Sequence, residues 1–163
     1  MRSASLVALS LFVAVSVMSI GRAAHASHYA VGDVPRLITP AEAEKLHKAG
    51  VNTTEELLDK AAKPKDRKSL AKSSGLGAPT LLDLARRCDL LRIKGVGSEM
   101  VLLLEASGVK TTAELAKKDV ATLSAAIATA NQTKKITEKP PADPQIQYWI
   151  EEAKKLPPVL ESK

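Results

Sequence analysis

An internal repeat is the strongest structural signal in this sequence. The segment 46–57 aligns without a gap on the segment 104–115. The two segments share a helix-ending glycine, a Thr-x-x-Glu capping box and apolar anchors: Leu46/Leu104, Gly50/Gly108, Val51/Val109, Thr53/Thr111, Glu56/Glu114 and Leu57/Leu115. These residues specify a helix, a tight glycine turn, a valine beneath the turn and a second capped helix. We therefore expect the same unit to be built twice.

Residues that typically begin or end a helix occur throughout the remaining sequence. Thr39-Pro40 provides an N-cap followed by a proline at the first helical position, and Asp119 can cap a helix that reaches about Asn131. Ser98 is expected to cap a helix containing the apolar run 100–104, which is typical of a core helix packed between the repeats. No segment alternates with a period of two for long enough to predict a strand. The sequence therefore predicts an all-α fold.

Each repeat also closes with an amphipathic helix of similar design, because residues 81–87 resemble residues 149–155. We therefore predict two tandem helical repeats in one compact domain that follows an N-terminal signal segment. The predicted boundaries are residues 1–26 for a signal peptide, 27–36 for a polar leader, 37–88 for the first repeat, 89–157 for the second repeat and 158–163 for a tail.

Residues 1–26 have the three parts of a secretory signal peptide. Arg2 supplies the positive n-region, residues 6–20 form a continuous run of apolar and small residues, and Ala24-His25-Ala26 fits an A-x-A cleavage site. A retained membrane anchor is the alternative, although the run is short for a bilayer span of roughly 20 residues. No cysteine follows the run directly, which excludes a lipoprotein anchor. The sequence predicts an exported protein, periplasmic or extracellular, that begins at Ser27 after cleavage.

Charge and aromatic content narrow the function classes. Removal of residues 1–26 takes away two arginines and no acids, so the net charge falls from +6 to +4, with 22 basic and 18 acidic side chains left. This balance is well short of the strongly cationic arms that bind nucleic acid. The aromatic residues that remain are Tyr29, Tyr148 and Trp149. This scarcity argues against a single-strand binder that stacks bases on aromatic side chains.

No constellation of reactive side chains points to an enzyme. His28 and His47 have no cysteine or carboxylate at ligand spacing, so no metal site is predicted. No G-x-S-x-G motif sets up an activated nucleophile, and the single cysteine, Cys88, fits a small buried apolar side chain. We expect no catalytic residues, no cofactor and no small-molecule substrate. The basic run 63–72 is interpreted as a solvated helix face, with a phosphate-binding patch as the alternative.

The segment 93–97, Ile-Lys-Gly-Val-Gly, is the pattern that could bind a ligand. Two glycines allow a tight turn between helices, and the valine fits into the helix pair. The helix that follows begins with free backbone N–H groups, which can hold a phosphate. The candidate nucleic-acid-binding residues are Arg92, Lys94, Gly95, Val96, Gly97 and Ser98.

These residues resemble the hairpin of the helix-hairpin-helix (SAM-like) superfamily. More closely, the chain is similar to a bacterial family of unknown function that pairs two such units, over residues 35–156. The resemblance is carried by Leu84-Ala85, Asp89 to Gly97, Leu103 to Ala106, Gly108-Val109, Glu114-Leu115, Trp149 and Ala153-Lys154. It implies an all-α fold of two tandem helix-hairpin-helix-like repeats and no known catalytic activity. It implies little about the ligand.

Two departures from the hairpin pattern bear on DNA binding. DNA-binding hairpins usually carry a basic residue after the second glycine, whereas Glu99 would repel a phosphate here. In the first repeat, residues 37–39 (Leu-Ile-Thr) replace Gly95-Val96-Gly97. Paired hairpins hold both strands of a duplex, so at most one of the two hairpins could bind DNA here. We therefore expect a non-catalytic module that binds another protein, with an unidentified envelope protein as its partner. The alternative is an exported protein that binds DNA weakly and non-specifically through backbone phosphates, favoured by Arg92 and Lys94.

Overall fold

The computed structural model describes residues 28–161, and every regular element in that range is helical. The elements are a 3-10 helix, η1 (Val31–Asp33), and the α-helices α1 (Pro40–Lys48), α2 (Thr54–Ala61), α3 (Pro64–Ser74), α4 (Ala78–Leu90), α5 (Ser98–Ala106), α6 (Thr112–Leu115), α7 (Val120–Lys134) and α8 (Asp143–Lys155). The predicted all-α fold is confirmed. The predicted signal peptide lies outside the described residues. Between residues 28 and 161, no helix has the length and apolar character needed to cross a membrane.

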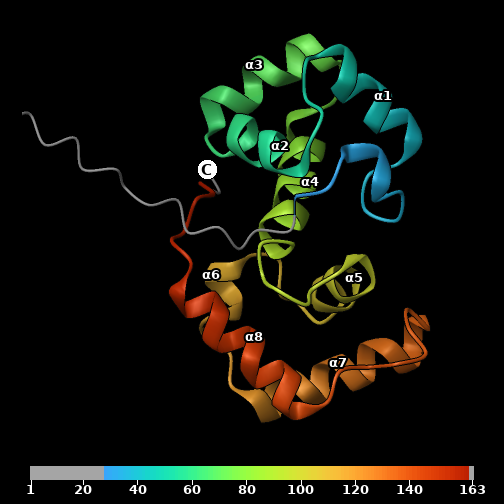
Figure 1. The fold of residues 1–163 in the computed structure, drawn as a ribbon, viewed down its shortest axis with the longest axis vertical. Coiled ribbons are helices and arrows are strands. Elements are labelled where there is room, and N and C mark those ends of the chain that lie inside the picture. The colour runs from blue at the N-terminus through green and yellow to red at the C-terminus, as the bar shows by residue number, and fades with distance from the viewer. Residues whose placement is uncertain (1–27, 162–163) are drawn as a thin grey trace, which may run out of the picture.

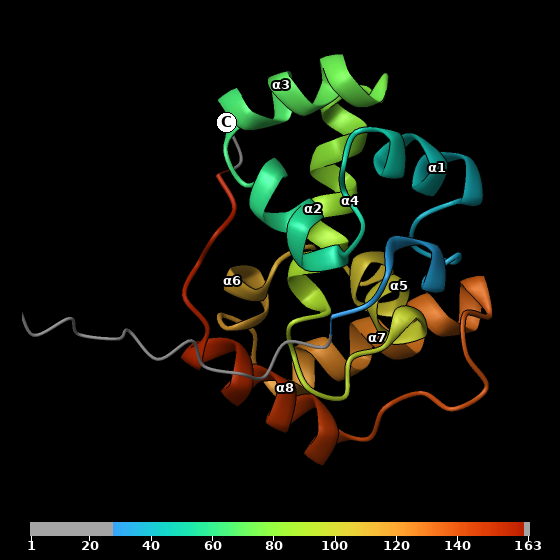
Figure 2. The same ribbon diagram turned by 45° about the horizontal axis from the view of Figure 1, so that its top comes forward.

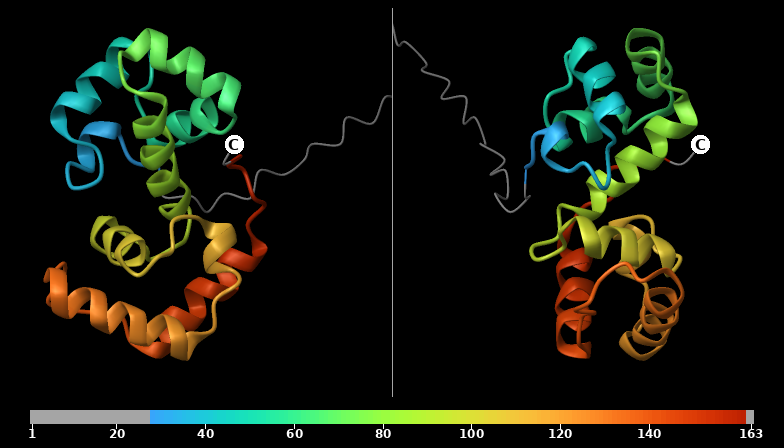
Figure 3. Two further views of the ribbon diagram at one scale, coloured as in Figure 1. Left: turned by 180° about the vertical axis from the view of Figure 1, so that it is seen from behind. Right: turned by 90° about the vertical axis from the view of Figure 1, so that its right-hand side faces the viewer.

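The helices pack in two groups of four that share three helix pairings (Figure 1), and in the first group α2 also packs on α3. In the first group α1 packs on α3, and α4 packs on both α2 and α3. In the second group α5 packs on α7, and α8 packs on both α6 and α7. α4 runs from the first group towards the second and contacts α5. The views from behind and from the side show the same two stacked groups (Figure 3).

The sequence repeat has the same backbone structure in both groups. α1 and α5 are each nine residues long. Each is followed by a glycine with positive φ, 71° at Gly50 and 81° at Gly108. The next residue, Val51 or Val109, donates its N–H to a leucine carbonyl of the preceding helix at 2.9 Å in both cases. The predicted glycine turn is therefore present twice.

The predicted threonine cap is formed in both repeats, with a reciprocal bond one residue earlier than in a standard capping box. The hydroxyl of the cap threonine accepts the N–H of the glutamate at 3.1 Å, in the pairs Thr53–Glu56 and Thr111–Glu114. Each glutamate carboxylate accepts the N–H of the residue before the threonine, at 2.7 Å in both repeats. α2 and α6 thus begin with the same two hydrogen bonds, and the bond to the threonine hydroxyl satisfies a backbone donor that a helix start leaves unpaired.

The start of α5 differs from the prediction. Ser98 does not cap this helix, because Ser98 is already its first residue and Gly97 occupies the N-cap position. Glycine has no side chain, so no side-chain hydrogen bond closes the start of α5. In the first group Thr39 occupies the matching position and forms a complete capping box with Glu42. The two groups therefore differ at the entry to their first helix.

α7 begins as predicted and ends later. The Asp119 side chain accepts the N–H of Thr122 at 2.9 Å, and this hydrogen bond lowers the pKa of the Asp119 carboxyl. The helix continues to Lys134, past its predicted end near Asn131. Lys135, with a φ of 50°, terminates it in the left-handed conformation.

One aliphatic core joins the two groups. Its largest fully buried side chains come from both groups: Trp149, Leu37, Ile38, Leu46, Leu57, Leu81, Leu84, Leu90, Leu91, Ile93, Leu103 and Leu104. α5 is less enclosed than predicted, because Met100 and Leu102 are only partly buried against this core. α5 therefore keeps one side partly open.

Four of the five arginines among the described residues donate to backbone carbonyls far away in the sequence. The bonds are Arg36 to Ile136 (3.1 Å), Arg67 to Glu161 (2.7 Å), Arg87 to Leu37 (2.8 Å) and Arg92 to Pro157 (3.2 Å). The fifth, Arg86, pairs with Asp83 on its own helix. A guanidinium group carries five N–H donors in a fixed planar fork, so it can serve several acceptors at once.

The basic run 63–72 is only partly the solvated face that the sequence predicts. Its lysines are exposed, but Arg67 is 4% exposed and also donates to the carbonyls of Ala61 and Ala62 at 2.8 and 2.9 Å. Glu161, in the predicted tail, is held at the same place, because its N–H also donates to the Ala62 carbonyl at 3.0 Å. Figures 1 and 2 show the red C-terminal segment reaching the start of α3.

Leu104→Ala tests the shared core. Leu104 is fully buried, and its truncation leaves a cavity, so the free energy of unfolding should fall by roughly 2–5 kcal/mol in a denaturant titration. Leu102→Ala, on the partly open side of the same helix, is the matched control and should cost roughly 1 kcal/mol. Equal losses for the two variants would contradict this packing of α5.

Candidate functional site

The candidate hairpin forms the turn between α4 and α5. α4 ends at Leu90, and α5 begins at Ser98. The N–H of Ile93 donates to the Leu90 carbonyl at 3.1 Å, and the N–H of Val96 donates to the Ile93 carbonyl at 3.0 Å. Val96 is buried at 2% exposure, as the sequence predicts. The structure thus brings all six candidate residues into one turn, although it gives them different environments.

Arg92 faces the protein interior. Its guanidinium donates to Asp89 Oδ1 at 2.7 Å and to the Pro157 carbonyl. The second carboxylate oxygen of Asp89 accepts the N–H and the hydroxyl of Thr112 at 2.8 and 2.9 Å. The side chains of Arg92 and Asp89 are only 14% and 3% exposed, and breaking a buried pair costs about 3–5 kcal/mol. Arg92 therefore connects the hairpin to the C-terminal segment directly and to α6 through Asp89.

Only one of the two hairpin glycines has a backbone that requires glycine. Gly95 has a φ of 86°, in the left-handed region that a Cβ disfavours. A Cβ at Gly95 would lie 3.5 Å from Trp149 Nε1, a buried donor with no acceptor among the described residues. Gly97 is extended, with φ −93° and ψ −176°, and nothing lies within 4 Å of its Cβ position. Gly95 is thus required by its left-handed backbone, whereas Gly97 leaves the start of α5 open.

Opposite charges meet at the start of α5. The Glu99 carboxylate accepts from Arg36 Nη1 at 2.6 Å, and the two side chains are 49% and 45% exposed. An ion pair this exposed adds little stability, but it neutralises both charges beside the helix start. Lys94 is exposed, and its side chain forms no ion pair with any residue that the structure describes. Lys94 is therefore the basic candidate residue that a ligand can reach.

The segment of the first group that aligns with the hairpin has a different structure. Leu37 and Ile38 are buried at 1% exposure. The Thr39 hydroxyl accepts the Glu42 N–H at 3.3 Å, and the Glu42 carboxylate accepts the Thr39 N–H at 2.8 Å. These bonds close the start of α1 with its own side chains. The effect of the missing glycines on phosphate binding stays a prediction.

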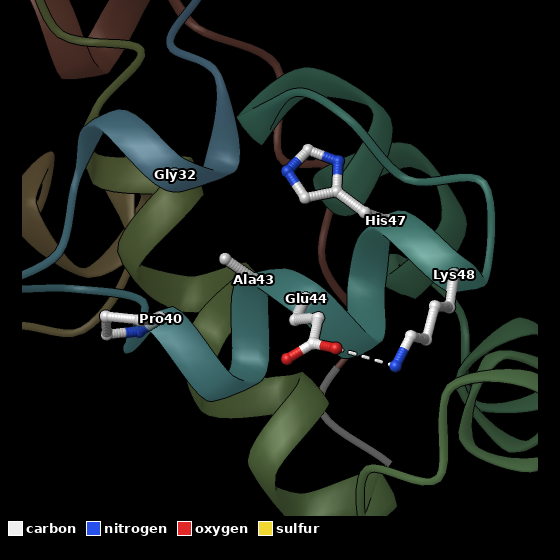
Figure 4. A pocket seen from close by; sticks show the side chains of 6 residues that line it. All are labelled: Gly32, Pro40, Ala43, Glu44, His47 and Lys48. Atoms are coloured by element: carbon white, nitrogen blue, oxygen red, sulfur yellow. Dashed lines mark hydrogen bonds and ion pairs between the residues drawn. The ribbon is translucent and has the colours of Figure 1, made fainter.

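An open hollow lies beside α1 (Figure 4). Its volume is about 630 Å³, and its lining residues are Gly32, Pro40, Ala43, Glu44, His47 and Lys48. Glu44 pairs with Lys48 at 2.7 Å, which lowers the pKa of the Glu44 carboxyl. His47 Nδ1 lies 3.0 Å from Asn52 Oδ1. The polar side chains at its edge are thus paired within the chain, and the hollow offers an apolar surface.

Two further hollows meet where α5 faces α7. One, of about 510 Å³, is lined by Ala106, Ser107, Ala125, Ala126, Thr129, Ala130, Thr133 and Lys134. The other, of about 600 Å³, is lined by Arg87, Leu102, Glu105, Ala106, Lys110, Lys134 and Ile136. Ala106 and Lys134 line both hollows, so the two hollows are adjacent, and together they are called the α5–α7 groove here.

Side chains with potential reactivity are buried or paired. Cys88 is 3% exposed, and burial raises the pKa of its thiol to about 12, so the nucleophilic thiolate does not form near neutral pH. His28 Nδ1 lies 3.4 Å from a Glu55 carboxylate oxygen. Between residues 28 and 161, no group of three His, Cys, Asp or Glu side chains could hold a metal ion.

Two features of the site are not evident from the sequence pattern. The first is the ion pair between Arg36 and Glu99. Arg36 aligns with Lys94 in the repeat, and this match is a signal that Arg36 lies near the start of α5. The α5–α7 groove is built from small side chains of α7, such as Ala126 and Ala130. Their spacing of one helical turn is a weak signal, because alanines at that spacing occur in most helices.

Gly95→Ala and Gly97→Ala separate the roles of the two glycines. We expect Gly95→Ala to lower the free energy of unfolding by roughly 1–2 kcal/mol, because its left-handed backbone brings a Cβ too close to the following carbonyl. Gly97→Ala should cost less than about 1 kcal/mol, the usual difference between the two residues at an N-cap. Denaturant titrations measure both values, and a larger loss in Gly97→Ala would contradict the described turn.

Comparison with known proteins gives one match. No curated protein and no solved structure matches the chain. A protein-family model described as Domain of unknown function (DUF4332) matches residues 36–156. The matched range contains all eight α-helices, the hairpin and the α5–α7 groove. The chain therefore belongs to the DUF4332 family.

Proposed function

We propose that this protein is an exported, non-catalytic helical module that binds another protein, with an envelope protein as its partner. In this proposal the two groups of four helices are tandem helix-hairpin-helix-like repeats. Residues 1–26 are a signal peptide that is removed on export. The equal glycine turns and threonine caps of the two groups support the repeat part of the proposal.

The binding proposal depends on one observation: the arginines at the hairpin are paired with groups of the chain itself. A hairpin that holds a duplex needs cations that face the phosphates. Here Arg92 is bound to Asp89 and Pro157, and the positive charge of Arg36 is cancelled by Glu99. The hairpin therefore acts as an architectural turn, and ligand recognition falls to another surface.

The α5–α7 groove supplies such a surface. Its floor is made of small side chains, and the exposed lysines Lys110 and Lys134 lie among its lining residues. An apolar centre with a charged margin is the usual anatomy of a protein–protein interface. The hollow along α7 favours a protein partner over a small-molecule substrate, because this part of the lining offers few converging polar groups of the kind that orient a substrate.

A second candidate function is weak, non-specific binding of duplex DNA through its phosphates. Lys94 is exposed beside the hairpin, and no side chain caps the N–H groups at the start of α5. A helix start of this kind favours an anion. The exposed lysines of α3 would add to the attraction, whereas Glu99 opposes it.

Fluorescence anisotropy with a labelled duplex separates the two functions. At physiological salt we expect no binding of the wild type in the micromolar range. Glu99→Lys exchanges a repulsive charge for an attractive one, and on the DNA hypothesis it should strengthen binding by about 1 kcal/mol. A micromolar or tighter dissociation constant for the wild type, weakened by salt and lost in a folded Lys94→Ala variant, would place DNA binding first.

A pull-down from the envelope fraction of the native host tests the proposed function directly. We expect a C-terminally tagged chain to recover a protein partner in equal amounts with and without nuclease. The intact mass of the recovered chain should correspond to a first residue at Ser27. Recovery that depends on nucleic acid would contradict protein binding, and a whole chain from Met1 found in the cytoplasm would contradict export.

A further inference from the structure

The α5–α7 groove has two arms with different chemistry. Figures 1 and 3 show α5 beside α7 in the second group. One arm runs along α7 and past the end of α5. The other arm includes residues of α4, the end of α5 and the segment that follows α7. Lys134 and Ala106 line both arms.

The arm along α7 is apolar although it contains threonines. Ala125, Thr129 and Thr133 follow one another at intervals of one helical turn, with Ala126 and Ala130 beside them. The Thr129 hydroxyl donates to the Ala125 carbonyl at 3.0 Å, and the Thr133 hydroxyl donates to the Thr129 carbonyl at 2.9 Å. Both hydroxyls are therefore satisfied within α7. A partner backbone can approach this arm closely, and large apolar side chains are needed to fill it.

The other arm carries a net positive charge. Its one acid, Glu105, accepts from Arg87 at 3.2 and 3.4 Å, so these two charges cancel. Lys110 and Lys134 are exposed, and neither side chain forms an ion pair within residues 28–161. Two positive charges are left at this end of the groove. A complementary ligand therefore presents negative charge here.

We propose that the α5–α7 groove binds an amphipathic helix of a partner protein that carries large apolar side chains and, near one end, carboxylates. This inference rests on the proposed function and names its binding surface. Apolar side chains at helical spacing fill the arm along α7, as in other helix-in-groove complexes. The carboxylates lie against Lys110 and Lys134, which sets the direction of the bound helix.

Within residues 28–161 the chain does not offer such a helix to a second copy of itself. The large apolar side chains that are exposed there are Tyr148 and Val159, at 43% and 36%. Tyr148 lies on α8, where two glutamates, Glu151 and Glu152, pair with lysines of the same helix. The α8 surface of a second copy would thus present one aromatic ring beside ion pairs whose charges cancel. The charge of the groove instead matches an acidic segment of a different protein.

The test uses two labelled synthetic peptides that share leucines at i, i+3, i+4 and i+7. One carries glutamates at its polar positions, and the other carries lysines there. The acidic peptide should bind the protein saturably in fluorescence anisotropy, and the basic peptide should not. The double variant Lys110→Glu, Lys134→Glu should weaken binding of the acidic peptide by about tenfold, since two exposed charge pairs become repulsive.

Two tryptophan variants of α7 locate the binding surface. Ala125→Trp fills the arm and should abolish peptide binding. Ala128→Trp is the matched control, because Ala128 is exposed on the same helix but does not line the groove. This control should bind like the wild type. Circular dichroism melting curves establish that both variants are folded.

Several results would overturn this assignment. Equal binding of the two peptides, or wild-type affinity in Ala125→Trp, would show that the groove does not select an acidic helix. If neither peptide binds while the envelope pull-down still recovers a protein, the groove is excluded and the proposed function stands. A dimer in solution that Ala125→Trp dissociates would make a second copy the occupant in place of a partner protein.

Discussion

The guanidinium group of Arg87 donates to the Leu37 carbonyl at the start of the first group of helices and pairs with Glu105 in the second. Arg36, Arg67 and Arg92 make comparable bonds to remote carbonyls. These contacts surround a core of aliphatic side chains, which pack well but specify relative orientation weakly. The arginine bonds add the directional constraint that keeps the two groups in one arrangement, and the hairpin and the groove both depend on it.

The features that could be predicted from the sequence are those with a local cause. A glycine turn or a helix cap is encoded within a few residues, so Gly50, Thr53 and Asp119 were assigned correctly. The arginine bonds could not be predicted in this way, because a backbone carbonyl has no residue identity to recognise. The same limit explains the buried Arg67 and the held C-terminal segment, both of which depend on a distant acceptor.

The candidate site shows the same division. The turn formed by residues 92–97 was located from its glycines, but the fate of each side chain depends on tertiary partners. Arg92 and Lys94 are two residues apart and both basic, yet Arg92 is half-buried and paired with the buried Asp89, whereas Lys94 is exposed. Ser98 was predicted to cap α5, but it is the first residue of that helix. Gly97, with an extended backbone, takes the N-cap position one residue earlier. Composition and spacing alone cannot separate these cases.

The C-terminal segment couples the stability of distant parts of the chain. Glu161 accepts from Arg67 and donates to Ala62, and Pro157 accepts from Arg92. If residues 157–161 detach, a guanidinium donor of the buried Arg67 loses its acceptor, and an unpaired buried donor is costly. Detachment of this short segment therefore weakens the first group as well, although the two are far apart in the sequence.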